Sequence, residues 1–113
     1  MAWKVIQFES LRGEKFVKEF IDRQNPAVKA KFIGMIDFLE EYGPFLSGKY
    51  TKKIRKNLYE LRITEKEQIG VFYTVWQQEI ILLHTFKKKT QKTPRQAIKL
   101  AEERKRDYFR RKK

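Results

Sequence analysis

Basic side chains gather in the second half of the chain, around the segment His84-Thr85-Phe86-Lys87-Lys88-Lys89. Arg62 lies in an earlier strand-like run, Leu58-Tyr59-Glu60-Leu61-Arg62-Ile63. Guanidinium and ammonium groups that converge can bind a phosphate and stabilise the charge that develops when a phosphate ester is cleaved. The lysines lead into Thr93-Pro94-Arg95-Gln96, which is typical of a capped helix start, where free backbone N–H groups also favour anions. These residue types point to a phosphate-containing ligand.

Each candidate cation has a functional interpretation and a structural one. Arg62 is the first candidate, as a forked phosphate ligand, and its alternative is a surface ion pair with Glu60. Lys88 and Lys89 are expected to clamp the same phosphate, and their alternative is a solvated turn. Further basic residues are expected to dock RNA without reading its sequence. They are Lys49, Lys52, Lys53, Arg55, Lys56, Lys87, Lys92 and Arg104.

Two further side chains have the chemistry of proton transfer or base stacking. His84 is the single histidine, and its unperturbed pKa of about 6.5 makes it a candidate acid or base. A lone histidine on a strand is more often a hydrogen-bonded structural residue. Tyr108 follows Arg104 by one helical turn, so it could stack on a base or orient the attacking group. Its alternative is to continue the apolar helix face of Ile98 and Ala101.

Composition bounds the class of protein. The 113 residues include no cysteine and one histidine, so a disulfide scaffold, a cysteine zinc site and a thiol nucleophile are excluded. We expect no metal ion or other cofactor. The longest strictly apolar run has four residues, Ile80-Ile81-Leu82-Leu83, whereas a membrane span needs roughly 20. We therefore expect a soluble, cytoplasmic, single-domain protein over residues 1–113.

The net charge of +13 is segregated along the chain. Residues 1–43 carry seven basic and seven acidic side chains, so residues 44–113 hold the whole excess. A one-sided basic field attracts polyanions. RNA, DNA, an anionic membrane surface and an acidic protein are all candidate partners, and plain solubility is the alternative. We favour a nucleic acid.

Apolar spacing predicts an α+β domain in the order β-α-α-β-β-β-α. The predicted strands cover 3–8, 58–64, 69–76 and 80–86, and the predicted helices cover 14–24, 26–42 and 94 to about 109. A basic tail is expected over 104–113. The segment 43–56 is expected to be a loop, and the short polar connections between the last three strands predict an antiparallel sheet.

Strand alternation predicts which side chains share a face of that sheet. The N-terminal helices should pack on the face with Tyr59, Leu61 and Ile63, which leaves Glu60 and Arg62 on an open face. On the last strand, Leu82, His84, Phe86 and Lys88 should share one face, with Leu83 on the opposite one.

The succession of these motifs resembles the HigB-like branch of the RelE/ParE toxin superfamily, the toxins of type II toxin–antitoxin modules. The resemblance covers residues 58–108, from Leu58-Tyr59-Glu60-Leu61-Arg62 through the block His84 to Pro94 and on to Tyr108. It implies a small sheet with helices on one face and an RNA groove on the other. It also implies a ribosome-dependent endonuclease that cuts messenger RNA and is neutralised by a cognate antitoxin, usually a helix-turn-helix DNA-binding protein.

One position departs from that resemblance. Related toxins usually carry an arginine where this chain has Gly70, and that arginine is thought to help hold the scissile phosphate. Either neighbouring lysines compensate, or the protein cuts slowly, or it acts otherwise. Restoring the arginine is expected to raise cleavage if compensation is incomplete. The alternatives to a nuclease are a ParE-like poison of DNA gyrase, a non-catalytic module that binds RNA or DNA, and a decayed toxin.

Overall fold

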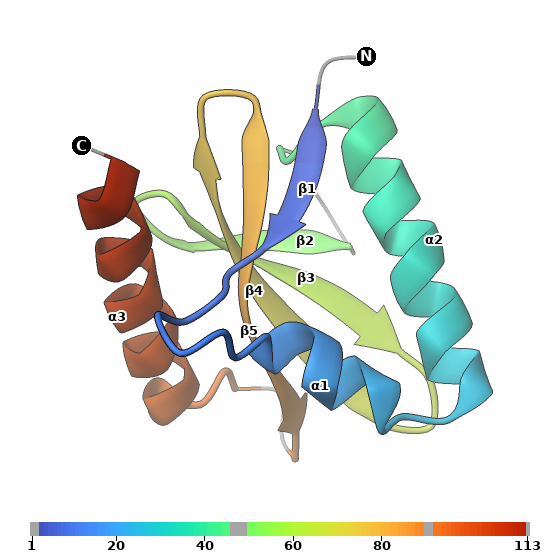
Figure 1. The fold of residues 1–113 in the computed structure, drawn as a ribbon. Coiled ribbons are helices and arrows are strands. Elements are labelled where there is room, and N and C mark those ends of the chain that lie inside the picture. Colours follow the sequence, from blue (N-terminus) through green and yellow to red (C-terminus); the bar gives the residue numbers. More distant parts are fainter. Residues whose placement is uncertain (1–2, 46–49, 90–91, 113) are drawn as a thin grey trace.

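The computed structural model describes residues 3–45, 50–89 and 92–112, which form one sheet flanked by helices (Figure 1). The elements are β1 Lys4–Gln7, α1 Phe16–Asp22, α2 Pro26–Tyr42, β2 Thr51–Arg55, β3 Leu58–Thr64, β4 Gln68–Trp76, β5 Glu79–Lys88 and α3 Arg95–Lys112. The α+β class is confirmed, and every predicted element is present. One strand, β2, was not predicted.

The sheet has five strands in the order β1-β5-β4-β3-β2. Strands β2 to β5 form an antiparallel meander. The predicted antiparallel pairing of the last three strands is confirmed. The first strand, whose pairing was not predicted, joins the sheet at one edge, where β1 pairs with β5 in parallel. A parallel pair needs a long crossover, and here residues 8–78 separate its two strands.

The strand β2 occupies part of the segment that we predicted to be a loop. Its lysines obscure the strand pattern, because lysine is depleted in strands. Thr51 is nevertheless buried, while Lys52 and Lys53 are exposed. Charged side chains are common on edge strands, where they discourage pairing with another sheet. The basic cluster is therefore the edge of the sheet.

One face of the sheet packs against α1 and α2. This core joins Leu61 and Ile63 to Val17, Ile21, Val28, Phe32 and Leu39, with Tyr59 partly buried beside it. The predicted face assignment is therefore confirmed. The start of α2 is also as predicted, because the Asn25 side chain accepts a hydrogen bond from the Val28 backbone N–H and Pro26 occupies the first turn.

We had predicted that the second face of the sheet is open. This prediction is wrong, because α3 packs on that face. Figure 1 shows α2 and α3 on opposite sides of the sheet. Ala97 and Ala101 let the helix approach the strands closely, and Tyr108 extends the contact. The strand residues beneath them are Leu58, Phe72, Ile81, Leu83 and Phe86. The sheet is therefore buried on both sides over this region.

A β-bulge in β5 corrects the predicted alternation. Phe72 pairs with His84 and the next residue, Tyr73, pairs with Leu82, so Leu83 is an extra residue. Leu82 packs with the α1–α2 core, whereas Leu83 packs with Phe86 in the α3 core. The prediction that Leu82 shares a face with Phe86, and that Leu83 lies opposite, is therefore wrong.

Candidate nucleic-acid site

A pocket of about 290 Å³ lies where β3, β4 and β5 reach the same end of the sheet. We call it the strand-end pocket. Its lining residues are Lys52, Glu60, Arg62, Ile63, Thr64, Gln68, Ile69 and Lys88. Strand register explains the set, because Lys52 pairs with Glu60 and Gln68 pairs with Lys88. Three of the lining side chains are cations and one is an anion.

Arg62 and Lys88, the two foremost candidates, both line the strand-end pocket. They come from β3 and β5, which are separated by β4. The Arg62 side chain is half-buried, and its Nε has no hydrogen-bond partner among the described residues. The Nε atom itself is buried. Arg62 and Lys88 therefore line one pocket from two strands that are not neighbours.

Glu60 is the residue that sequence reasoning placed incorrectly. We expected it on an open face, with Arg62 as its alternative partner. Its side chain is instead fully buried, and Oε2 lies 2.6 Å from Lys88 Nζ. Oε1 accepts a hydrogen bond of 3.0 Å from the Thr93 hydroxyl, just before α3. Strand alternation gives the face of Glu60, but it cannot identify a partner that lies two strands away.

Gly70 faces the same side of the sheet as Glu60, between Arg62 and Phe86 in the strand register. A Cβ atom there would lie 2.4 Å from Phe86 Cζ and 2.8 Å from Glu60 Oε2. Both distances are far below van der Waals contact. The Phe86 ring therefore occupies the space that any side chain at position 70 would need.

The other lysines of the β5 end are more exposed. Lys89 follows Lys88 and is exposed. Lys87 forms an exposed ion pair of 3.1 Å with Glu67. Lys92 is also exposed. Only Lys88 among these four lines the strand-end pocket within the described residues.

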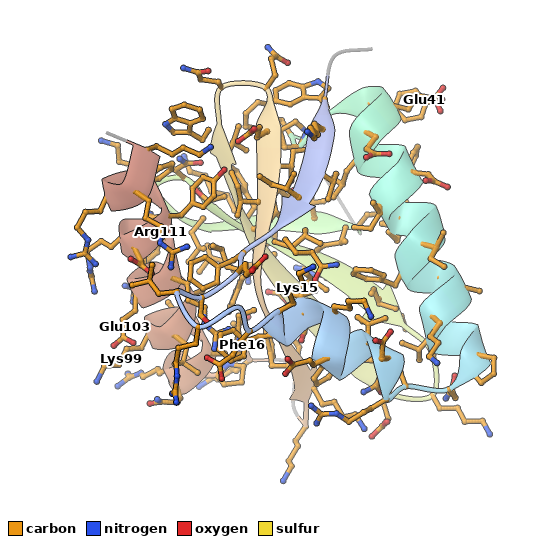
Figure 2. The ribbon with its side chains drawn as sticks, viewed as in Figure 1. Lys15, Phe16, Glu41, Lys99, Glu103 and Arg111 are labelled. Atoms are coloured by element: carbon orange, nitrogen blue, oxygen red, sulfur yellow. The ribbon has the colours of Figure 1, made fainter. Side chains whose placement is uncertain are left out.

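The basic cluster of β2 divides between two surfaces. Lys52 lines the strand-end pocket, and Lys53 lies on the opposite face by alternation. Arg55 lines a separate hollow of about 380 Å³ with Arg95, Ile98, Lys99, Glu102, Glu103 and Arg106. Figure 2 shows Lys99 and Glu103 pointing away from the sheet. Lys56 is exposed, and Lys49 lies outside the described residues.

His84 does not line the strand-end pocket. Its Nδ1 lies 3.0 Å from a guanidinium nitrogen of Arg104, and its ring stacks near Phe86. Burial, together with the charge of Arg104, lowers the pKa of His84 to about 4. The imidazole is therefore neutral at pH 7. Four residues separate it from Lys88, which corresponds to about 13 Å along a strand.

Arg104 has a clear structural partner at the bulge. It donates a hydrogen bond of 2.9 Å to the Leu83 carbonyl, at the residue that has no partner on β4. Its guanidinium also lies 4.0 Å above the Phe16 ring, which Figure 2 labels at the start of α1. Burial lowers the pKa of Arg104. The side chain links β5, α1 and α3, and it does not reach the strand-end pocket.

Tyr108 lies at the other end of the sheet. Its hydroxyl donates a hydrogen bond of 2.8 Å to Glu79, the first residue of β5. Burial and that carboxylate raise the pKa of Tyr108. Lys88 ends the same strand, nine residues further on, so about 30 Å separate the two backbone positions. The structure does not bring Tyr108 together with Arg62 and Lys88.

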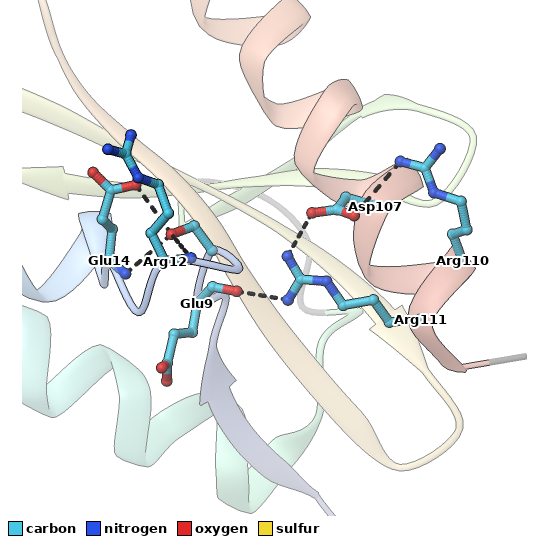
Figure 3. A network of polar contacts seen from close by, with 7 residues as sticks. Glu9, Arg12, Glu14, Asp107, Arg110 and Arg111 are labelled. Atoms are coloured by element: carbon cyan, nitrogen blue, oxygen red, sulfur yellow. Dashed lines mark hydrogen bonds and ion pairs between the residues drawn. The ribbon is translucent and has the colours of Figure 1, made fainter.

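The predicted basic tail is part of α3, which continues to Lys112. Arg111 donates to the Glu9 carbonyl at 2.7 Å and pairs with Asp107 at 2.5 Å. Figure 3 shows this arginine between the loop after β1 and the last helix. Arg110 also pairs with Asp107, at 3.5 Å. These contacts attach the end of α3 to the rest of the fold.

Within residues 3–45, 50–89 and 92–112, no group of three or more histidine, aspartate or glutamate side chains is arranged to hold a metal ion. In the same residues, no helix has the length and apolar character needed to cross a membrane.

Comparison with known proteins identifies the family. The model of the phage-derived protein Gp49-like family (DUF891) matches residues 19–106. The match includes α2, the strands β2 to β5 and most of α3, and hence all residues of the strand-end pocket. A comparison with curated proteins finds no match. The Gp49-like family is phage-derived and known in toxin–antitoxin systems, where its members resemble RelE and HigB toxins. The match covers well over half of the sequence, and the chain therefore belongs to the Gp49-like family.

Proposed function

We propose that this protein is the toxin of a type II toxin–antitoxin module, of the HigB-like kind, and that it cuts messenger RNA on the ribosome. The observation that carries the proposal is the convergence of Arg62, Lys88 and Lys52 on one pocket at the end of the sheet. The Gp49-like family and the net charge of +13 support it further. A pocket of this size and polarity fits a phosphate and its sugar.

The proposed reaction uses the ribose 2′-oxygen as the nucleophile. It attacks the adjacent phosphorus, the bond to the 5′-oxygen breaks, and the products are a 2′,3′-cyclic phosphate and a 5′-hydroxyl. The proton of the 2′-hydroxyl is lost, and the leaving oxygen gains one. Arg62 and Lys88 would stabilise the extra charge on the phosphorane oxygens, which is often the largest catalytic contribution of such sites.

The remaining residues take supporting roles in this proposal. Lys89 would contact the next phosphate from the end of β5. The exposed lysines and arginines Lys49, Lys52, Lys53, Arg55, Lys56, Lys87 and Lys92 would dock ribosomal RNA. His84 is neutral at pH 7 and hydrogen-bonded to Arg104, so we assign it a structural role. Tyr108 and Arg104 are assigned structural roles for the contacts described above.

The proposed protein partner is a cognate antitoxin. A neutraliser of so basic a protein should present acidic side chains where it touches the cations, because complementary charge sets both the association rate and the specificity. The resemblance to HigB-like toxins suggests that it is a helix-turn-helix protein. A neighbouring reading frame of that type would support this part of the proposal.

The test adds purified protein to ribosomes that translate a labelled message. Cleavage is expected, and Arg62→Ala should abolish it while the variant stays folded. Intact message together with tight, salt-sensitive RNA binding would leave a non-catalytic binding module. Intact message together with double-strand breaks trapped on DNA gyrase would instead identify a gyrase poison. Either result would overturn the nuclease proposal.

A further inference from the structure

We propose that Glu60 is a positioning residue that holds the Lys88 ammonium at the wall of the strand-end pocket. This inference rests on the proposed function, because it assigns Lys88 to the phosphate. Glu60 itself need not touch RNA. It acts through Lys88, and the geometry of three separate segments supports this role.

The ion pair between Glu60 and Lys88 is the most buried one described. The Lys88 side chain is 8% exposed and that of Glu60 is fully buried, at 2.6 Å between Nζ and Oε2. The other ion pairs of the described residues each include at least one side chain that is 19% exposed or more. A lysine side chain is otherwise flexible, with four rotatable bonds. Here its head group has a fixed position before any ligand binds.

The carboxylate of Glu60 is itself fixed from a second side. Thr93 donates its hydroxyl proton to Oε1 at 3.0 Å, and Thr93 immediately precedes Pro94 and α3. The carboxylate therefore joins β3, the end of β5 and the start of α3. Supporting contacts of this kind hold a functional group within a fraction of an ångström of its working position.

Gly70 leaves the space in which this arrangement fits. A Cβ atom at position 70 would lie 2.8 Å from Glu60 Oε2. Any side chain there would push the carboxylate away from its present position, or displace the Phe86 ring. The glycine and the buried carboxylate are therefore parts of one packing arrangement.

The ion pair leaves Lys88 able to bind a ligand. An ammonium group has three N–H donors, and the ion pair brings a single Glu60 oxygen, Oε2, within 2.6 Å of it. Lys88 lines the pocket together with Arg62 and Lys52, so its other donors are available on the pocket side. Fixing a flexible cation in advance removes part of the entropic cost of binding and orientation.

The test compares Glu60→Gln with wild type in single-turnover cleavage on programmed ribosomes, at saturating ribosome concentration. Glu60→Gln should lower the rate constant about 100-fold, the effect of moving a catalytic group by about 1 Å. Affinity for the ribosome should change less than about threefold, because the exposed docking lysines are untouched. Glu67→Gln is the matched control, since it removes the exposed partner of the neighbouring Lys87. It should leave the rate constant unchanged.

A double-mutant cycle separates positioning from mere structural support. Lys88→Gln should slow cleavage strongly in the wild-type background and less than about threefold when Glu60→Gln is already present, because coupled residues are not additive. An equal effect of Lys88→Gln in both backgrounds would overturn the proposal. Folded Glu60→Gln that cuts at the wild-type rate would do the same.

A second variant covers the case in which Glu60→Gln does not fold, and a second measurement covers the case in which the wild-type protein does not cleave RNA. If Glu60→Gln does not fold, Glu60→Asp keeps the charge but withdraws the carboxylate by one methylene, and wild-type cleavage by that variant refutes positioning. If the wild-type protein cuts no message, the nuclease proposal fails. The double-mutant cycle is then measured as binding affinity for a 2′-deoxy oligonucleotide. If Lys88→Gln weakens binding equally with and without Glu60→Gln, the role of Glu60 is refuted independently of the nuclease proposal.

Discussion

Gly70 lies in β4 at a place where the packing leaves no room for a side chain, so Gly70→Ala tests the arrangement beneath the strand-end pocket. The added Cβ would lie 2.4 Å from Phe86 Cζ, whereas carbon atoms in contact are about 3.5–4.0 Å apart. The ring must move by about 1 Å or more. It is 8% exposed and packs against Phe72 at 4.8 Å between centroids, so it has little space to move into.

The expected cost follows from two opposing contributions. Overpacking a core typically costs about 1–3 kcal/mol. Replacing glycine in a strand recovers about 0.5–1 kcal/mol of backbone entropy. The contact of 2.4 Å with a buried ring favours the upper part of the overpacking range, about 2–3 kcal/mol. Gly70→Ala should therefore destabilise the fold by about 1–2.5 kcal/mol, measured as a lower midpoint of urea unfolding at unchanged slope. In a domain of about 100 residues, the melting temperature should fall by about 4–8 °C for each kcal/mol.

The chain supplies both a control and a rescue for this substitution. Gly34 lies in α2 with no atom within 4 Å of an added Cβ, so Gly34→Ala should stabilise the protein by about 0.5–1 kcal/mol. Phe86→Leu removes the ring atoms that collide, and it should cost less in the Gly70→Ala background than in wild type. Unchanged or increased stability of Gly70→Ala would refute the packing argument, as would simple additivity with Phe86→Leu.

The same geometry revises the expectation for Gly70→Arg. The resemblance to HigB-like toxins suggested that an arginine there would raise cleavage. Its side chain would have to leave the sheet through the space filled by Phe86 and the Glu60 carboxylate. We therefore expect loss of stability and no gain in cleavage per folded molecule. A folded Gly70→Arg variant that cuts faster than wild type would contradict this expectation.

Four further outcomes are expected. Lys88→Met leaves the Glu60 carboxylate buried and unpaired, so urea unfolding should show a loss of about 3–5 kcal/mol, most of it restored by adding Glu60→Gln. Tyr108→Phe removes one hydrogen bond to a carboxylate and should cost about 1.5–3 kcal/mol in urea unfolding, while cleavage per folded molecule stays at the wild-type level. The folded pKa of His84, about 4, lies below its ordinary value of 6.5, so the unfolded chain binds more protons between these values. Stability should therefore fall from pH 6.5 to 4, and His84→Gln should reduce this dependence in thermal melts. RNA binding should weaken steeply between 50 and 200 mM salt, and Lys52→Gln should reduce the slope of the logarithmic plot by about one.

The helices and the central strands could be predicted from the sequence because local signals specify them. Asn25-Pro26 starts α2 and Gly43 ends it, and in the structure Asn25 caps the helix as expected. Alternation in β3 gave the correct core face. The strand β2 was missed because its lysines lie at a sheet edge, where burial on one side is slight. A strand of that kind is recognised by its pairing partner, and pairing is not a local property.

The bulge in β5 limits how far strand alternation could predict the face on which each β5 side chain lies. Counting alternate residues backward from Lys88 places Phe86 and His84 correctly on the α3 face, because the extra residue Leu83 lies before them. Counting one step further, to Leu82, gives the wrong face. Alternation is reliable only between irregularities, and nothing in the local residue types marks where the extra residue falls.

The partner of Glu60 required information that no local pattern contains. Strand alternation puts Glu60 and Arg62 on one face, where the nearest arginine is the natural partner of a surface carboxylate. Burial changes that choice, because a fully buried carboxylate needs a fixed cation and a second donor. Lys88 and Thr93 supply these from positions 28 and 33 residues further along the chain. The register of three strands brings these residues together. Composition alone describes Lys88 as one lysine among many. Within the described part of the chain, it is the cation that a buried ion pair holds beside Arg62 in the strand-end pocket.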